Sequence, residues 1–229
     1  SAASDVYKRQ ALEKAVAMEH ECDVDKQAAS YKTLNEARAL LRRFKSAVGQ
    51  FQYCYTAQAE ANRQYQSHLK TARLYISHFI QVLNLAVLRN EVRKEHKLFY
   101  GLDPEDFAVP ELTGEKHILV WGERLIEGER ERVSHGGAPI YNPTIAKVTV
   151  HYDIFKEAYR EQQNYKLNTT RSQSGLDALR EEADRIILDL WNQVETYYAD
   201  LPAEIRLNRC RAYGVVYYYR SGEKRPEDD

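Results

Sequence analysis

A three- and four-residue rhythm of apolar side chains constrains this chain more than any other feature of its sequence. The rhythm keeps one phase over residues 34–90, and fourteen of its 17 positions are apolar or aromatic. A period near 3.5 over this length predicts a long helix that packs along a seam, in the manner of a coiled coil. The positions are Leu34, Ala37, Leu41, Phe44, Val48, Phe51, Tyr55, Gln58, Asn62, Tyr65, Leu69, Ala72, Ile76, Phe79, Leu83, Ala86 and Asn90.

Gly49 is the only glycine or proline within this rhythm. A glycine inside a helix costs about 1 kcal/mol relative to alanine and can mark a bend or a hairpin. Because the apolar positions keep the same phase on both sides of Gly49, we predict one continuous helix and assign it to residues 25–98. The alternative is that the chain folds back at this glycine.

A second run of the same kind extends over residues 143–200. Asn142 suits a helix cap and Pro143 suits the first helical position, so the two mark its beginning. Polar residues crowd positions 162–175, where the helix could bend. An unbroken run of this length spans about 87 Å, which exceeds the radius of gyration of roughly 17 Å expected for a compact chain of this size.

Shorter segments flank the two runs. Residues 1–24 predict a short N-terminal helix, and residues 99–142 form a connector with a helix over 115–134 that Gly122 and Gly128 interrupt. The predicted class is therefore all-α, with two very long helices in an elongated antiparallel hairpin or bundle and shorter helices beside them.

The C-terminal segment, residues 201–229, differs in composition from the rest of the chain. Its stretch 213–220 is rich in aromatic and β-branched residues and predicts an extended, strand-like conformation. A single strand lacks a ladder partner in a helical chain. The segment therefore either pairs with another molecule or packs as coil against a helix.

Tyrosine is the compositional outlier, with 17 residues against 6 phenylalanines and 2 tryptophans. Its ring is large and apolar while its hydroxyl tolerates water, a combination typical of association surfaces. We therefore predict a protein-contact surface near the C-terminal end. Its candidate residues are Tyr197, Tyr198, Tyr213, Val215, Val216, Tyr217, Tyr218 and Tyr219.

Two amides, Gln58 and Asn62, occupy positions of the apolar seam. A buried amide without a partner costs about 1–3 kcal/mol, and polar seam residues can determine register and partner number. The two residues either serve that purpose or mark a place where the seam opens to water.

Charge and hydropathy exclude two classes of partner. Lys and Arg total 33 and Asp and Glu total 34, so a net charge of -1 lacks the positive excess that nucleic-acid binding uses. The most apolar window covers residues 74–88, and its 15 residues fall short of the ~20 apolar residues of a membrane span. It also contains the polar residues Ser77, His78, Gln81 and Asn84.

Cysteine usage favours a reducing compartment. Cys22, Cys54 and Cys210 are too few and too scattered for a disulfide framework or a zinc site. We also expect no secretory signal at the N-terminus. The expected location is the cytoplasm.

One acidic stripe is the sharpest candidate for chemistry. Glu123, Glu127, Glu131 and His135 are four residues apart, so a continuous helix carries them on one face, where they could ligate a metal. The alternative is a solvated stripe balanced by neighbouring arginines through helical charge pairs. The spacing lacks the Glu-x-x-His pairs of di-iron bundles, so we predict no metal, no cofactor and no catalytic residue.

These observations predict a non-enzymatic, self-associating helical scaffold whose partner is a second copy of the chain or another protein. One alternative is a compact helical bundle that binds a protein or a small ligand between its helices. A further alternative is a metal-dependent enzyme that uses the stripe from Glu123 to His135. Residues 4–10 resemble a linker-derived peptide that recurs in translated sequence assemblies, so we base no functional argument on them.

Overall fold

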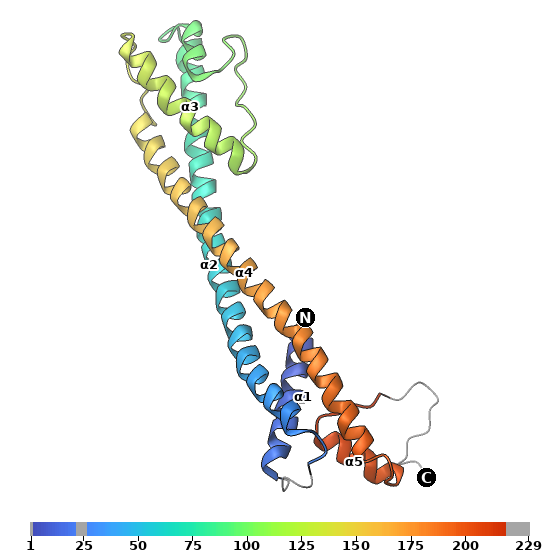
Figure 1. Cartoon of the computed structure of the whole chain (residues 1–229). Coiled ribbons are helices and arrows are strands. Elements are labelled where there is room, and N and C mark those ends of the chain that lie inside the picture. Colours follow the sequence, from blue (N-terminus) through green and yellow to red (C-terminus); the bar gives the residue numbers. More distant parts are fainter. Residues whose placement is uncertain (1, 22–26, 219–229) are drawn as a thin grey trace. The chain divides into compact units, whose positions relative to one another are not determined.

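The computed structural model describes residues 2–21 and 27–218 of the 229-residue chain (Figure 1). These residues form helices and no strand, which confirms the all-α class. The helices are α1 (Ala2–Glu21), α2 (Tyr31–Leu88), the 3₁₀ helix η2 (Lys94–Tyr100), α3 (Gly114–Ser134), α4 (Ile145–Tyr197) and α5 (Ala203–Ala212).

The chain divides into two compact units. The first unit contains residues 1–55 and 168–229, and the second contains residues 56–167. Each of the long helices α2 and α4 therefore contributes one part to each unit. The two units have separate apolar cores.

Both long helices begin at hydroxyl caps. The Ser30 side chain accepts a hydrogen bond from the Thr33 backbone N–H at 3.2 Å, so α2 begins later than the predicted residue 25. The Thr144 side chain accepts one from the Lys147 N–H at 3.4 Å. The predicted cap of α4 was wrong, because Asn142 has a φ of 59° and lies outside the helix.

The end of α2 has a specific backbone cause. Asn90 adopts a left-handed φ of 59°, and the Glu91 N–H donates to the Ala86 carbonyl at 2.9 Å. The Asn90 N–H donates to the Val87 carbonyl at 3.0 Å, which completes a Schellman motif. This motif ends the helix at Leu88, ten residues before the predicted end.

Gly49 and Gly175 lie inside continuous helices. The prediction that α2 is unbroken at Gly49 is confirmed, and α4 also continues through the polar stretch 162–175. Both glycines are exposed, and a methyl group on either would have no neighbouring atom within 4 Å. Neither glycine is therefore needed for packing.

We expect Gly49→Ala and Gly175→Ala each to raise the free energy of unfolding by about 1 kcal/mol, because alanine loses less backbone entropy in a helix. Urea unfolding followed by circular dichroism measures this gain. Gly101→Ala serves as the matched control and should destabilise the protein, because Gly101 has a φ of 69°. A bend at Gly49 or Gly175 would remove the expected gain.

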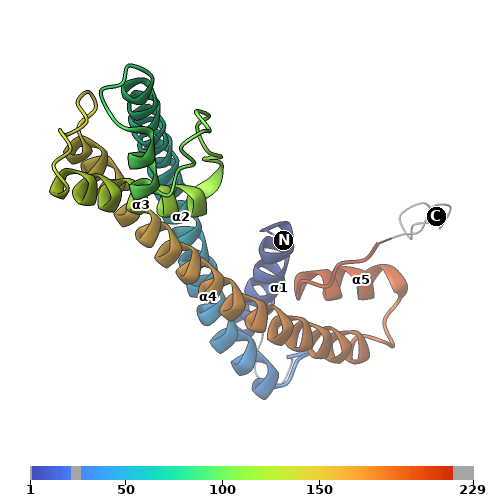
Figure 2. The same ribbon diagram turned by 90° about the horizontal axis from the view of Figure 1, so that it is seen from above.

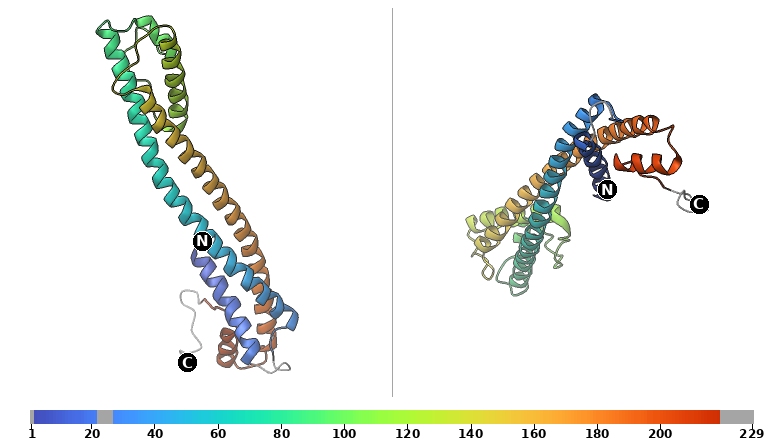
Figure 3. Two further views of the ribbon diagram at one scale, coloured as in Figure 1. Left: turned by 90° about the vertical axis from the view of Figure 1, so that its left-hand side faces the viewer. Right: turned by 90° about the horizontal axis from the view of Figure 1, so that it is seen from below.

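The core of the first unit joins α1, the beginning of α2 and the end of α4, which lie side by side in Figure 3. The Thr33 hydroxyl donates to Asp189 at 3.2 Å, and the Thr169 hydroxyl donates to the Cys54 carbonyl at 3.2 Å. As the residue number rises along α2, the number of its contact partner on α4 falls. The two helices are therefore antiparallel in this unit. The buried residues are Ala11, Leu12, Ala15, Ala28, Ala29, Leu34, Ala37, Leu40, Leu41, Ala183, Ile186, Ile187, Leu190, Val194, Cys210, Tyr213 and Val215.

In the second unit α3 packs against η2 and the beginning of α4 (Figures 1 and 2). A methyl group on Gly122 would lie 2.3 Å from the Tyr152 ring, and one on Gly128 would lie 2.7 Å from the Phe99 carbonyl oxygen. The predicted interruptions at these glycines were wrong. The helix is continuous, and the missing side chains let its neighbours approach its backbone.

The C-terminal segment forms no strand within the part of the chain that the structure describes. Its backbone turns after α5, where the Val215 N–H donates to the Cys210 carbonyl at 3.2 Å. Gly214 has a φ of 89°, and a methyl group on it would lie 3.0 Å from the Ala11 carbonyl oxygen. Residues 213–215 therefore pack as coil against α1, the second of the two predicted possibilities.

Candidate functional site

The last four turns of α2, residues 74–88, carry no charged side chain on their solvent side. Leu74, Leu85 and Leu88 are 64%, 50% and 60% exposed, and His78 and Gln81 between them are also exposed. The sequence contains no Asp, Glu, Lys or Arg from residue 74 to residue 88. We call these five residues the outer face.

The outer face lies opposite the core. At about 100° per residue, its five positions fall within an arc of about 80°. Ile76, Phe79 and Leu83 on the other side of the helix are fully buried. The five positions are separated by four, three, four and three residues, which is the spacing of a heptad seam. The segment 74–88 thus carries one seam that is buried and a second that is open.

The solvent side of α4 in the same unit shows the ordinary alternative. Asp153, Glu157 and Arg160 are exposed there. Lys156 pairs with Asp153 at 3.0 Å, and Arg160 pairs with Glu157 at 3.7 Å. Charge pairs of this kind keep a helix face solvated, so the uncharged outer face of α2 is a local departure.

The two amides of the predicted seam differ in how far they are exposed to solvent. Gln58 is half-buried, whereas Asn62 is exposed. The exposure of Asn62 agrees with the interpretation that the seam opens to water at this residue. Whether Gln58 determines register stays a prediction.

Four of the predicted contact residues pack within the first unit. Tyr213 and Val215 are buried, and the Tyr213 hydroxyl accepts a hydrogen bond from the Ala28 N–H at 3.2 Å. Tyr198 and Tyr217 are half-buried against the same core. Burial also raises the pKa of the Tyr217 phenol. Tyr213 and Val215 are therefore not open surface, whereas Tyr198 and Tyr217 keep part of their surface exposed.

The other predicted contact residues are exposed, where they are described. Tyr197 is 51% exposed, Val216 38% and Tyr218 82%. Tyr219 lies outside the described residues. Tyr197, Val216 and Tyr218 remain candidates for protein contact in the first unit.

The acidic stripe lies in solvent. Its four residues, Glu123, Glu127, Glu131 and His135, are all exposed, and His135 follows the last residue of α3. Among the residues that the structure describes, no group of three or more His, Cys, Asp or Glu side chains could hold a metal ion. The geometry therefore favours the solvated stripe.

The ionic group that α3 buries is a different one. Glu129 and Arg132 are each 1% exposed and form a salt bridge of 3.0 Å. The Arg132 Nε donates to the Tyr100 hydroxyl at 2.7 Å, and that hydroxyl donates to Glu129. Burial and this hydrogen bond raise the pKa of the Tyr100 phenol. Both residues continue the three- and four-residue spacing of the buried positions 118, 122 and 125, but the sequence pattern did not reveal the cluster, because charged side chains normally mark a solvated position.

The same ion pair holds the loop after α3. The Arg132 Nη2 donates to the Ala138 carbonyl at 2.7 Å, and the Ile140 N–H donates to Glu129 at 2.7 Å. Both partners therefore bond to the backbone of a loop that leads into α4. The cluster connects η2, α3 and this loop, which is a structural role.

A buried lysine connects another loop of the second unit. Lys97 has no exposed surface, donates to the Asp106 carbonyl and lies 4.2 Å from the centre of the Phe107 ring. Burial lowers the pKa of the Lys97 ammonium. These contacts attach the loop after η2 to that helix.

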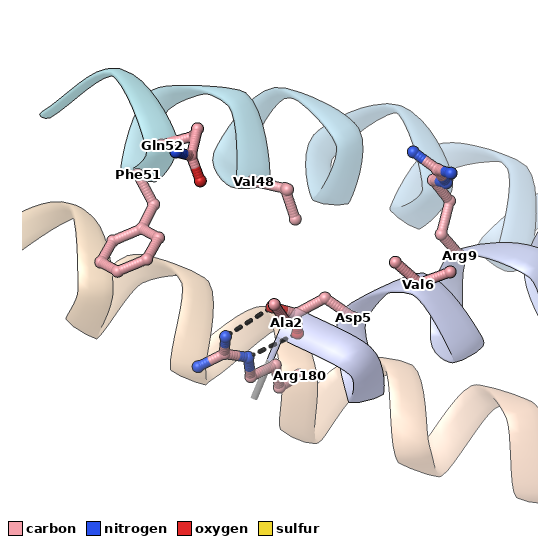
Figure 4. A pocket seen from close by; sticks show the side chains of 8 residues that line it. All are labelled: Ala2, Asp5, Val6, Arg9, Val48, Phe51, Gln52 and Arg180. Atoms are coloured by element: carbon pink, nitrogen blue, oxygen red, sulfur yellow. Dashed lines mark hydrogen bonds and ion pairs between the residues drawn. The ribbon is translucent and has the colours of Figure 1, made fainter. Parts of the chain in front are cut away.

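A small cavity in the first unit lies between α1, α2 and α4 (Figure 4). Val48 and Phe51 line it on one side, and Asp5 accepts hydrogen bonds from Arg180 at 2.6 and 2.7 Å on the other. Hydrogen bonding to Arg180 lowers the pKa of Asp5. The volume of about 170 Å³ is below the ~300 Å³ of typical ligand pockets, and Asp5 belongs to the linker-like residues 4–10.

The chain matches no protein-family model, no curated protein and no solved structure. Across the described ranges, none of the helices combines the length and apolarity needed to span a membrane.

Proposed function

We propose that this chain is a non-enzymatic helical scaffold that associates with copies of itself through the outer face of α2. The observation that carries the proposal is an uncharged helix face of four turns with three exposed leucines. Protein interfaces are depleted of charge at their centre, whereas the free surface of a soluble helix is normally charged. Exposed apolar side chains that gather on one uncharged helix face point to an interaction site, whereas singly scattered ones do not.

A second copy is the partner that the charges support. The net charge of -1 produces no long-range repulsion between copies. Two outer faces in contact bring no like charges together, because neither contains an Asp, Glu, Lys or Arg side chain. Free thiols are consistent with the cytoplasmic location that we propose for this scaffold, since Cys54 and Cys210 are both free and buried.

Sedimentation velocity over a range of concentrations tests the proposal. A contact of about 22 Å along one helix is small, so we expect reversible association in the micromolar range. Leu74→Glu should leave the protein monomeric, because it would bring a carboxylate without a partner into an apolar contact. Leu98→Glu is the matched control, since Leu98 on η2 is 63% exposed and lies outside the outer face.

Wild-type protein that stays monomeric over this concentration range would contradict the proposal. Equal association of the Leu74→Glu and wild-type proteins would show that another surface makes the contact. Tyr197, Val216 and Tyr218 in the first unit are then the next surface to vary.

The elongated antiparallel hairpin predicted from the heptads is part of the same proposal. Unbroken α2 and α4 support it. Small-angle scattering should give a monomer radius of gyration well above the roughly 17 Å of a compact chain of this length.

One observation favours a second candidate function, a module that binds a small ligand. A cavity of about 390 Å³ lies between α3 and the beginning of α4, within the usual size range of ligand pockets. Ile126, Val133, Pro139 and Ile145 give it apolar walls. Binding of an apolar fluorescent dye that Val133→Trp abolishes would support this candidate.

A further inference from the structure

We infer that two copies pack their outer faces antiparallel, related by a two-fold axis that passes through Gln81. The inference rests on the proposed self-association and adds its geometry. It is carried by the order of side chains along the outer face, by the chemistry of the central residue and by the place where α2 ends.

The order of side chains is nearly symmetric about Gln81. Leu74 lies seven residues before Gln81 and Leu88 lies seven residues after it. An antiparallel partner centred on Gln81 therefore brings Leu74 of one copy opposite Leu88 of the other, at both ends of the contact. His78 of each copy, three residues before Gln81, lies within one residue of Leu85 of the other, which is four residues after it. The contact thus has five layers, with Gln81 of both copies in the central one. In the other four layers every leucine gains an apolar or aromatic neighbour.

The central layer satisfies its own polar groups. A glutamine side chain carries both an acceptor oxygen and a donor amide. The Gln81 Nε2 already donates to the Ser77 hydroxyl at 3.1 Å, and on a two-fold axis its second N–H can donate to the oxygen of the other Gln81, so the facing amides satisfy each other. Such a contact is isologous and closes after two copies. An amide at the centre of an otherwise apolar seam also selects one register over slipped ones.

The parallel arrangement is less favourable on two counts. It would bring His78 of one copy beside His78 of the other, and this is the one titratable side chain on the outer face. It would also place the two C-terminal ends of α2 side by side at Leu88, where the helix carbonyls carry partial negative charge. In the antiparallel pair each of these ends lies beside Leu74, away from the C-terminal end of the partner helix.

Cysteine cross-linking distinguishes the two arrangements. The background is the full chain with Cys22→Ser, Cys54→Ala and Cys210→Ala, and sedimentation first checks that it still associates. Leu74→Cys and Leu88→Cys are then oxidised separately and as an equal mixture. The antiparallel pair predicts that the mixture forms a disulfide-linked dimer of one of each, while each variant alone does not.

Two further variants calibrate the reaction. Gln81→Cys should cross-link with itself, because the two-fold axis places both thiols in one layer. Val150→Cys is the matched control for random collision, since Val150 on α4 is 55% exposed and outside the outer face. Facing thiols have a millimolar effective concentration, so they should oxidise about a hundredfold faster than this control at about 10 µM protein.

Each result has one meaning. Self-cross-linking of Leu74→Cys and of Leu88→Cys would show a parallel pair and overturn the inference while leaving the proposed function intact. An associating protein in which neither the mixture nor Gln81→Cys cross-links faster than Val150→Cys would show that the outer face is not the contact. Wild-type protein that sediments only as a monomer would remove the proposed function itself.

Discussion

Replacing Arg132 by methionine is expected to lower the free energy of unfolding by about 3–5 kcal/mol. The guanidinium is 1% exposed and holds Glu129, which is equally buried, together with the Tyr100 hydroxyl. Methionine fills much of the same volume but leaves the Glu129 carboxylate without its counter-charge. A buried charge without a partner is costly, and the loop carbonyl at Ala138 loses its donor as well.

Urea unfolding of three variants isolates this effect. Arg130→Met is the matched control, because Arg130 is exposed on the same helix and its loss should change stability by no more than about 0.5 kcal/mol. The double variant Glu129→Leu with Arg132→Met removes both charges and should recover part of the loss. It cannot recover all of it, because the Ile140 N–H then lacks an acceptor. A loss below about 1 kcal/mol for Arg132→Met would contradict the structural role of the cluster.

Adding one methyl group at Gly128 is expected to cost about 1–3 kcal/mol. The new carbon would lie 2.7 Å from the Phe99 carbonyl oxygen, and backbone cannot rotate away as a flexible side chain can. Alanine is otherwise the better helix former by about 1 kcal/mol, so the sign of the change reports the packing. Thermal or urea unfolding of Gly128→Ala measures it.

Glycines at other helical positions supply the comparison. Gly49→Ala adds the same methyl group where no atom lies within 4 Å, and it should stabilise the protein. Gly122→Ala should destabilise it, because the methyl group would lie 2.3 Å from the Tyr152 ring. Stabilisation by Gly128→Ala would mean that η2 does not press closely against α3.

The long helices could be predicted from the sequence, whereas their ends could not. The apolar rhythm reports helix type because residues three and four apart share a face of the same helix. Helix ends depend on single residues that the rhythm does not include. Asn90 continues the predicted pattern, yet its left-handed backbone ends α2.

The candidate site was only half visible in the sequence. The absence of charge from residue 74 to residue 88 is a sequence signal, and the apolar character of this segment predicts burial. What the sequence does not reveal is that only one side of the segment is covered. Apolarity alone cannot separate Ile76, which is buried, from Leu74, which is 64% exposed.

The sequence by itself determined that the chain is helical and that α2 passes through Gly49, because both depend on interactions within a few residues along the chain. Only the tertiary structure decided which apolar and charged side chains are covered. Burial depends on neighbours that are distant in sequence: Tyr213 lies against Ala28, and Arg132 lies against Tyr100. Local patterns contain no information about such pairs, and for that reason the buried cluster and the open outer face emerged from the fold.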